Sequence, residues 1–185
     1  MVHTHLINGL QPESRPRRRT ARIAHELNRY KVDIVALSET RLSGADSLTE
    51  VGQGYTFFWK GYEENQPRNH GVGFAIRTQL LSKFSVTPVG ISPRLMTWRI
   101  PLVKHRFLTL ISAYAPTLDA DEERKDEFYE TLDRIIASIA KDDKVILLGD
   151  FNARVGKADY LWPHVIGKQG MGRMNSNGLR LLSLC

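Results

Sequence analysis

Cysteine and long apolar runs are almost missing from this sequence of 185 residues. Its one cysteine, Cys185, can form no internal disulfide, which favours a reducing compartment. No apolar run approaches the roughly 20 residues that span a bilayer. The first residues also lack the basic and apolar blocks of a secretory signal. We therefore expect an intracellular protein without a membrane partner, and the nucleus stays open as its compartment.

Internal repeats and low-complexity stretches are absent as well, so the chain is expected to form one domain over residues 1–185. Hydrophobic residues make up 42% and charged residues 25%, the balance of a globular protein. The net charge of +6 favours a polyanionic partner, of which nucleic acid is the commonest, although many basic proteins bind none. Five arginines crowd together near the start and are candidate nucleic-acid contacts: Arg15, Arg17, Arg18, Arg19 and Arg22.

Strand and helix patterns alternate along the chain. We expect a helix that Thr20 caps, with Ile23, Leu27 and Tyr30 on one apolar face, and a second helix from Asp121 to Ile139. A further helix is expected to begin at Asn177. Five short apolar runs predict strands, at residues 32–37, 71–77, 95–103, 107–114 and 144–148. Strands mixed with helices in this way indicate sheets that are covered by helices on their outer faces.

Three polar clusters follow predicted strands, where a rigid sheet can hold them in one cleft. Glu39 offers a hard oxygen ligand for Mg²⁺ or Mn²⁺, or is an ordinary polar residue at a strand exit. Tyr114 is either a phenol that contacts phosphate or an amphipathic side chain with its hydroxyl in water. Asp150 can orient a water and Asn152 can donate to a phosphoryl oxygen; the alternative is a simple Asp/Asn turn. Gly149 permits a close backbone approach beside them.

Four segments in this order resemble motifs of the endonuclease/exonuclease/phosphatase superfamily: SETRL at 38–42, GVGFAI at 71–76, SAYAP at 112–116 and GDFNARVG at 149–156. That superfamily includes apurinic endonucleases, pancreatic deoxyribonuclease and the endonucleases of non-LTR retrotransposons. The stretch from Arg18 to Leu42 is most similar to retrotransposon-derived endonucleases and to craniofacial-development-protein-2-like sequences. The resemblance implies an α+β fold, a four-layer α/β/β/α sandwich, here incomplete at the C-terminus.

The resemblance also implies roles for single residues. Glu39 would be a ligand of a divalent metal cofactor, Mg²⁺ or Mn²⁺. Tyr114 would contact phosphate, Asp150 would orient or activate the attacking water, and Asn152 would help stabilise the transition state. The reaction would be an in-line attack on phosphorus in DNA. The retrotransposon likeness implies a reverse transcriptase domain encoded downstream as a partner.

Two departures from the family pattern bear on activity. Leu6 stands where the family has an asparagine that supports the metal site, and Asn8, two residues later, is the candidate replacement. The family's catalytic histidine, in a Ser-Asp-His motif, has no counterpart here, because none of the six histidines lies in such a motif. We therefore expect a truncated domain with activity several orders of magnitude below that of a complete one. The alternatives are a catalytically inactive nucleic-acid-binding fragment and a phosphatase of the same superfamily.

Overall fold

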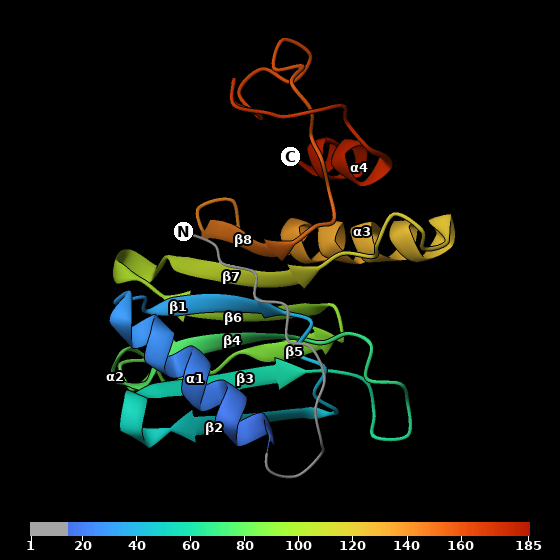
Figure 1. Cartoon of the computed structure of the whole chain (residues 1–185). Helices are drawn as coiled ribbons and strands as arrows, with labels where there is room; N and C mark the ends of the chain where they lie inside the picture. The colour runs from blue at the N-terminus through green and yellow to red at the C-terminus, as the bar shows by residue number, and fades with distance from the viewer. Residues whose placement is uncertain (1–14) are drawn as a thin grey trace. The chain divides into compact units, whose positions relative to one another are not determined.

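Two four-stranded sheets form the centre of the chain in the computed structural model, which describes residues 15–185, with side chains from Arg19 onward (Figure 1). The chain divides into two compact units. Unit 1 comprises the chain up to Ala113 together with Lys141–Gly149, and unit 2 comprises Tyr114–Ala140 together with Asp150–Cys185.

The first sheet has the strand order β1-β4-β3-β2, and every neighbouring pair is antiparallel. Its strands are β1 (Ile34–Ser38), β2 (Ala45–Glu50), β3 (Tyr55–Lys60) and β4 (Val72–Arg77). The register pairs Ser38, the last residue of β1, with Val72, the first residue of β4. The polar segment after β1 therefore begins beside the loop that leads into β4.

The second sheet has the strand order β5-β6-β7-β8. Its strands are β5 (Val89–Ser92), β6 (Leu95–Pro101), β7 (Phe107–Tyr114) and β8 (Lys144–Asp150). β5, β6 and β7 are antiparallel neighbours, whereas Figure 1 shows β7 and β8 pointing the same way. A helical crossover between two adjacent strands produces this parallel arrangement. As a result, Tyr114 and Asp150 leave the sheet at the same edge.

The core of unit 1 lies between the two sheets and under helix α1 (Arg15–Arg29). β3 and β4 pack on β5 and β6, and Phe74 and Trp98 are fully buried there. On its other face the first sheet receives Ala24 of α1, which packs with Tyr55, Phe57 and Ala75. Helix, sheet and sheet thus make three successive layers, consistent with apolar faces that each need a partner.

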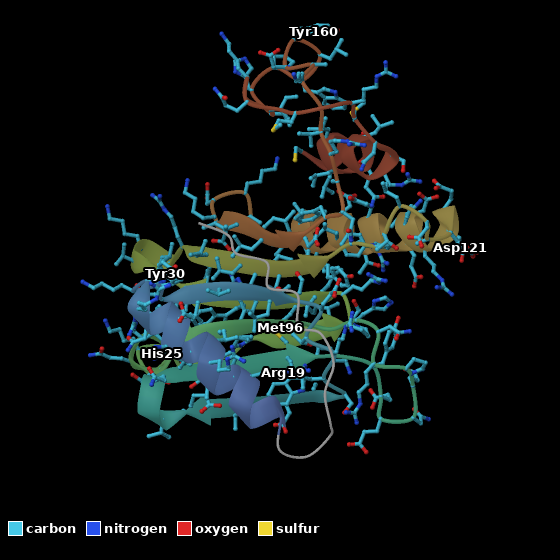
Figure 2. All side chains as sticks on the ribbon, in the orientation of Figure 1. Arg19, His25, Tyr30, Met96, Asp121 and Tyr160 are labelled. Atoms are coloured by element: carbon cyan, nitrogen blue, oxygen red, sulfur yellow. The ribbon has the colours of Figure 1, made fainter. Side chains whose placement is uncertain are left out.

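Short helical turns complete unit 1, and two longer helices make up most of the regular structure of unit 2. The turns are η1 (Val51–Gln53), α2 (Thr78–Leu81) and η2 (Val103–His105). In unit 2, α3 (Glu122–Ala137) packs against α4 (Ser176–Leu184) through buried Phe128, Leu132 and Leu182. The segment between β8 and α4 contains no helix or strand. Tyr160, near its middle in the sequence, is exposed (Figure 2).

The sequence predicted most elements and their types, with boundaries shifted by a few residues. The strand at 107–114 is confirmed at both ends, as β7, and the predicted helices correspond to α1, α3 and α4. Three strands were not predicted: β2, β3 and β5. β5 carries Gly90 and β2 is mostly exposed, so neither has the apolar run that marks a buried strand.

Two details of the first predicted helix were wrong. Thr20 does not cap α1 but lies inside it, where its hydroxyl donates to the carboxylate of Glu50. Tyr30 does not belong to the apolar face, because α1 ends at Arg29 and the Tyr30 side chain is 61% exposed (Figure 2). Ile23 and Leu27 do pack against the sheet, and Ala24, a residue too small to stand out in a hydrophobic pattern, is the most deeply buried of the helix.

The expected α+β fold class is confirmed by two sheets and four α-helices among the described residues. None of the helices in that part of the chain is long and apolar enough to cross a bilayer.

Candidate functional site

The segment that follows β1 holds Glu39 in a strained backbone conformation. Glu39 and Arg41 both have a φ of 53°, a left-handed conformation that side chains other than glycine rarely adopt. The strain is sustained by hydrogen bonds from the backbone N–H groups of Thr40 and Arg41 to the carbonyls of Gly71 and His70, at 3.1 and 3.0 Å. Such strain persists where surrounding structure enforces it, often at functional sites.

The carboxylate of Glu39 accepts a hydrogen bond from the Arg41 guanidinium at 3.3 Å. The Glu39 side chain is 20% exposed, whereas that of Arg41 is 39% exposed. A carboxylate that is mostly removed from water needs a positive partner, because burying an unpaired charge is costly. The Glu39 side chain is therefore paired with the more exposed side chain of Arg41.

A second arginine lies near this segment through His70. The Nη2 atom of Arg94 is 2.9 Å from Nε2 of His70. A guanidinium can only donate, so this nitrogen of His70 must accept, and the imidazole is neutral in this arrangement. The ring of Tyr62 lies 5.6 Å from that of His70, centroid to centroid. The sequence predicts no role for His70 or Arg94, because nothing in it links a histidine before β4 to a turn before β6.

The ends of β7 and β8 are joined by close backbone contact. The N–H of Ala115 donates to the carbonyl of Asp150 at 2.9 Å, just past Tyr114. Gly149 makes this approach possible, since it has a φ of 142° and a Cβ atom there would lie 1.8 Å from the carbonyl oxygen of Ala113. Any side chain at position 149 would push the two strands apart. The predicted need for glycine is confirmed.

Asp150 and Asn152 form a compact turn in unit 2. The N–H of Asn152 donates to Oδ1 of Asp150 at 2.9 Å, and Nδ2 of Asn152 donates to the carbonyl of Ala115 at 2.9 Å. Asn152 has a φ of 47°, which asparagine tolerates better than most residues. The sequence allowed either a simple Asp/Asn turn or a pair of catalytic groups here. The two interpretations are compatible, because the turn fixes the Asp150 carboxylate in one direction.

The structure brings three of the predicted site residues together within unit 2: Tyr114, Asp150 and Asn152. Tyr114 is only 4% exposed, and whether its hydroxyl contacts phosphate stays a prediction. Glu39 belongs to unit 1, and its convergence with the other three stays a prediction. Asn8 lies outside the described residues. Among the residues that are described, no three histidine, cysteine, aspartate or glutamate side chains gather as a metal site.

The arginines of the N-terminal cluster all fall within α1. Arg22 is exposed and Arg19 is half-buried, and the side chains of Arg15, Arg17 and Arg18 lie outside the described residues. Their contact with nucleic acid stays a prediction.

Two asparagines near the end of the chain were missed. Asn175 and Asn177 donate to a backbone carbonyl of the Asp150–Asn152 turn, that of Asn152. The signal available in the sequence was an asparagine just before a predicted helix, which indicates an N-cap but says nothing about a contact 25 residues away.

Comparison with known proteins identifies the class to which this geometry belongs. The sequence matches the endonuclease/exonuclease/phosphatase family over residues 4–180, and the chain belongs to this family. It is similar to craniofacial development protein 2 of Bos taurus, with 28% identity over 167 residues, 88% of this chain and 26% of that protein. The same protein of Tragulus javanicus is 27% identical over 166 residues, 88% of this chain and 27% of that protein. The chain spans about a quarter of the length of these curated relatives.

Among solved structures, the AP endonuclease LMAP from Leishmania major superposes with a TM-score of 0.55 at 14% sequence identity. The match covers 91% of this chain and 61% of that chain. At this level of identity the likeness shows a shared fold.

Proposed function

We propose that this chain is a phosphodiesterase domain that depends on a divalent metal and cleaves phosphodiester bonds in DNA as an endonuclease. The observation that carries the proposal is the turn at the end of β8, which fixes the Asp150 carboxylate beside the Asn152 carboxamide and the Tyr114 strand exit. Membership of the endonuclease/exonuclease/phosphatase family and the net charge of +6 support it.

Asp150 is the group that would orient the attacking water. Its Oδ1 atom is tied to the N–H of Asn152, so the carboxylate cannot turn freely. A carboxylate of fixed direction orients a water molecule toward phosphorus and can accept its proton. The Asn152 carboxamide uses one N–H on the carbonyl of Ala115, which leaves the second for a phosphoryl oxygen as negative charge develops there.

Glu39 is the described residue that suits a divalent cation. It supplies a hard oxygen donor that is largely shielded from water and already balanced by the positive charge of Arg41. When bound, Mg²⁺ or Mn²⁺ would supply Lewis-acid stabilisation of the charge on the phosphate. Asn8 would be a further ligand. Arg41, once separated from Glu39, could donate to two oxygens of a phosphate in a bidentate manner.

DNA would be held by basic side chains of α1. Arg19 and Arg22 belong to the cluster that also contains Arg15, Arg17 and Arg18. Contacts of this kind position the DNA backbone without selecting a base sequence, and they weaken as salt rises. We expect DNA retention that decreases steeply between low and physiological salt.

Nicking of supercoiled plasmid DNA tests the proposal. Wild-type protein with Mg²⁺ or Mn²⁺ should convert supercoiled to open-circular DNA, and EDTA should stop the reaction. Glu39→Gln should lose the activity, because the amide removes the charge that attracts the cation. Glu26→Gln is the matched control, since Glu26 also pairs with an arginine, Arg29, but lies on the solvent-exposed side of α1.

The two other candidate activities give different results in the same preparation. DNA retention that falls with salt, without EDTA-sensitive nicking, would indicate a catalytically inactive nucleic-acid-binding fragment. Release of inorganic phosphate from an inositol phosphate, with plasmid left intact, would indicate a phosphatase of the same superfamily.

We also propose that the chain derives from a non-LTR retrotransposon. The similarity of residues 18–42 to retrotransposon endonucleases supports this origin. A reverse transcriptase reading frame in the genomic sequence downstream of the Cys185 codon is the expected result, and its absence there would count against the origin.

A further inference from the structure

Two asparagines in the last part of the chain are bonded to the backbone of the proposed catalytic turn. Both lie in unit 2, as does the turn. Asn177 is fully buried, and Asn175 is half-buried at the start of α4. Neither has a place in the mechanism above, so their contacts call for a separate explanation.

The side-chain N–H groups of Asn177 donate to three backbone carbonyls. Its Nδ2 atom lies 2.8 Å from the carbonyl oxygen of Pro116, 3.4 Å from that of Phe151 and 3.3 Å from that of Asn152. Pro116 follows the exit of β7, and Phe151 and Asn152 follow the exit of β8. A single buried amide thus joins the two segments that carry the predicted catalytic side chains.

The oxygen atom of the Asn177 amide indicates that packing alone does not explain an asparagine at this position. Its Oδ1 is buried without a hydrogen-bond partner among the described residues. A buried acceptor that lacks a donor is destabilising. An apolar residue of the same size would avoid that cost, so the donors toward the loop carbonyls must provide the advantage.

Asn175 binds one of the same carbonyls, that of Asn152. Its Nδ2 donates to the carbonyl of Asn152 at 3.3 Å. Its Oδ1 accepts from the N–H groups of Gly178 and Arg154, at 2.7 and 3.0 Å. One side chain therefore caps α4 and satisfies the loop at once. Gly178 is required here, because a Cβ atom would lie 2.1 Å from the carbonyl oxygen of Arg154.

Helix α4, which carries Asn177, is itself anchored to α3. The hydroxyl of Tyr129 donates to the carbonyl of Asn177 at 3.2 Å. Arg180 pairs with Glu122 and Asp126, both at 2.7 Å. The two asparagines are therefore fixed by a pair of packed helices. Through them, the turn is connected to that helix pair.

We propose that Asn175 and Asn177, together the asparagine clamp, are positioning residues that hold Asp150 and Asn152 in their reactive orientation. The inference rests on the proposed function, because it names support for the same site. It goes further in assigning a mechanistic role to the segment before α4. A capping role alone would need only Asn175, whereas Asn177 lies in the first turn of the helix and directs its donors away from it, toward the loop.

The test uses Asn177→Leu in the full chain, which keeps the branched outline and the number of heavy atoms of the side chain and removes its donors. Hydrogen exchange should become at least tenfold faster at the N–H groups of Ala115 and Asn152, while Leu132 in the middle of α3 is unchanged. Asn177→Ala is the second variant, for use if leucine prevents folding. Asn65→Ala, at an exposed position in unit 1, is the matched control and should leave all three amides unchanged.

A kinetic measurement separates positioning from plain stability. If the wild-type chain nicks plasmid, Asn177→Leu should lower kcat at least tenfold and leave KM within about twofold, because it disturbs the reacting groups and not the arginines that bind DNA. Unchanged exchange at Ala115 and Asn152 would overturn the clamp. Equal acceleration at Leu132 would also overturn it, since the residue would then serve general stability. If the wild type leaves plasmid intact but exchange responds as expected, the clamp stands and the proposed function fails.

Discussion

Glu39 and Asp150, two carboxylates predicted to serve one reaction, are held in different ways. Glu39 is paired with the side chain of Arg41, which is 39% exposed. Asp150 is paired with the backbone N–H of Asn152, in a turn bonded to the asparagine clamp. A guanidinium on a flexible stem can yield to another cation, whereas a backbone amide has no comparable freedom. The exit of β1 thus permits exchange of partners, and the exit of β8 fixes one arrangement.

The largest effect is expected at the end of β8, where the backbone is held in one arrangement. Gly149→Ala places a methyl group against the carbonyl of Ala113 and forces alanine into a φ of 142°. Strain and overpacking together should lower the free energy of unfolding by about 3 kcal/mol or more. Urea denaturation measures this. Gly52→Ala is the matched control, because its Cβ would meet nothing within 4 Å. Equal stability of the two variants would show that the β7–β8 exit is not closely packed.

The next largest effect is expected from Asp150→Asn, which removes the negative charge of the side chain but keeps the geometry of the turn. The amide oxygen can still accept from the Asn152 N–H, so the turn should persist, with a melting temperature close to that of the wild type. The loss of negative charge should reduce nicking by about 100-fold or more, in line with the removal of a general base. Full activity in this variant would exclude Asp150 from the water-orienting role.

An intermediate effect is expected from Tyr129, which supports the clamp through Asn177. Burial raises the pKa of the Tyr129 hydroxyl to about 12 from its ordinary 10.0, while Arg180 partly opposes the rise. Because the folded pKa is the higher one, the stabilisation is complete below pH 10 and is lost as pH rises toward 12. A two-unit shift corresponds to at most about 2.7 kcal/mol.

Tyr129→Phe tests this assignment by urea denaturation between neutral and alkaline pH. It should cost about 1 kcal/mol near neutral pH, through loss of the hydrogen bond to the Asn177 carbonyl. It should also flatten the alkaline decline. A decline as steep as that of the wild type would assign the alkaline sensitivity to another group.

The smallest effect is expected at the Glu39–Arg41 ion pair after β1. Arg41→Gln removes the cation that faces Glu39, so Mn²⁺ should bind a few-fold more tightly, as measured by electron paramagnetic resonance titration of free Mn²⁺. Arg29→Gln removes a similar partner from Glu26 on α1 and should leave the Mn²⁺ affinity unchanged. Weaker Mn²⁺ binding in Arg41→Gln would show that Arg41 assists the cation and does not compete with it.

The sequence predicted the β8 exit better than the β1 exit, for a physical reason. GDFN follows an apolar strand, and its glycine, aspartate and asparagine are residues whose local preferences already favour a turn. The positive φ at Glu39 depends on hydrogen bonds to Gly71 and His70, more than 30 residues later. Patterns of local periodicity contain no information about such a distant pairing.

The same distinction explains the missed residues. Asn177 looks like an ordinary polar residue at a helix start, and only the packing of α4 against α3 shows that it is buried beside Pro116 and Phe151. β3 was missed although Tyr55–Lys60 is rich in aromatic residues, because β2, its hairpin partner in the first sheet, lacks the apolar run that would have suggested a pair of strands.

The central claim of the proposed function is that one divalent cation serves both Glu39 and the Asp150–Asn152 turn, and paramagnetic broadening by Mn²⁺ tests this prediction most directly. In ¹⁵N-labelled protein, substoichiometric Mn²⁺ should broaden the backbone amide signals of residues 39–41 and of Asp150 and Asn152 together. Glu39→Gln should abolish the broadening at both places. Broadening confined to residues 39–41, with the signals of Asp150 and Asn152 still sharp, would contradict the claim.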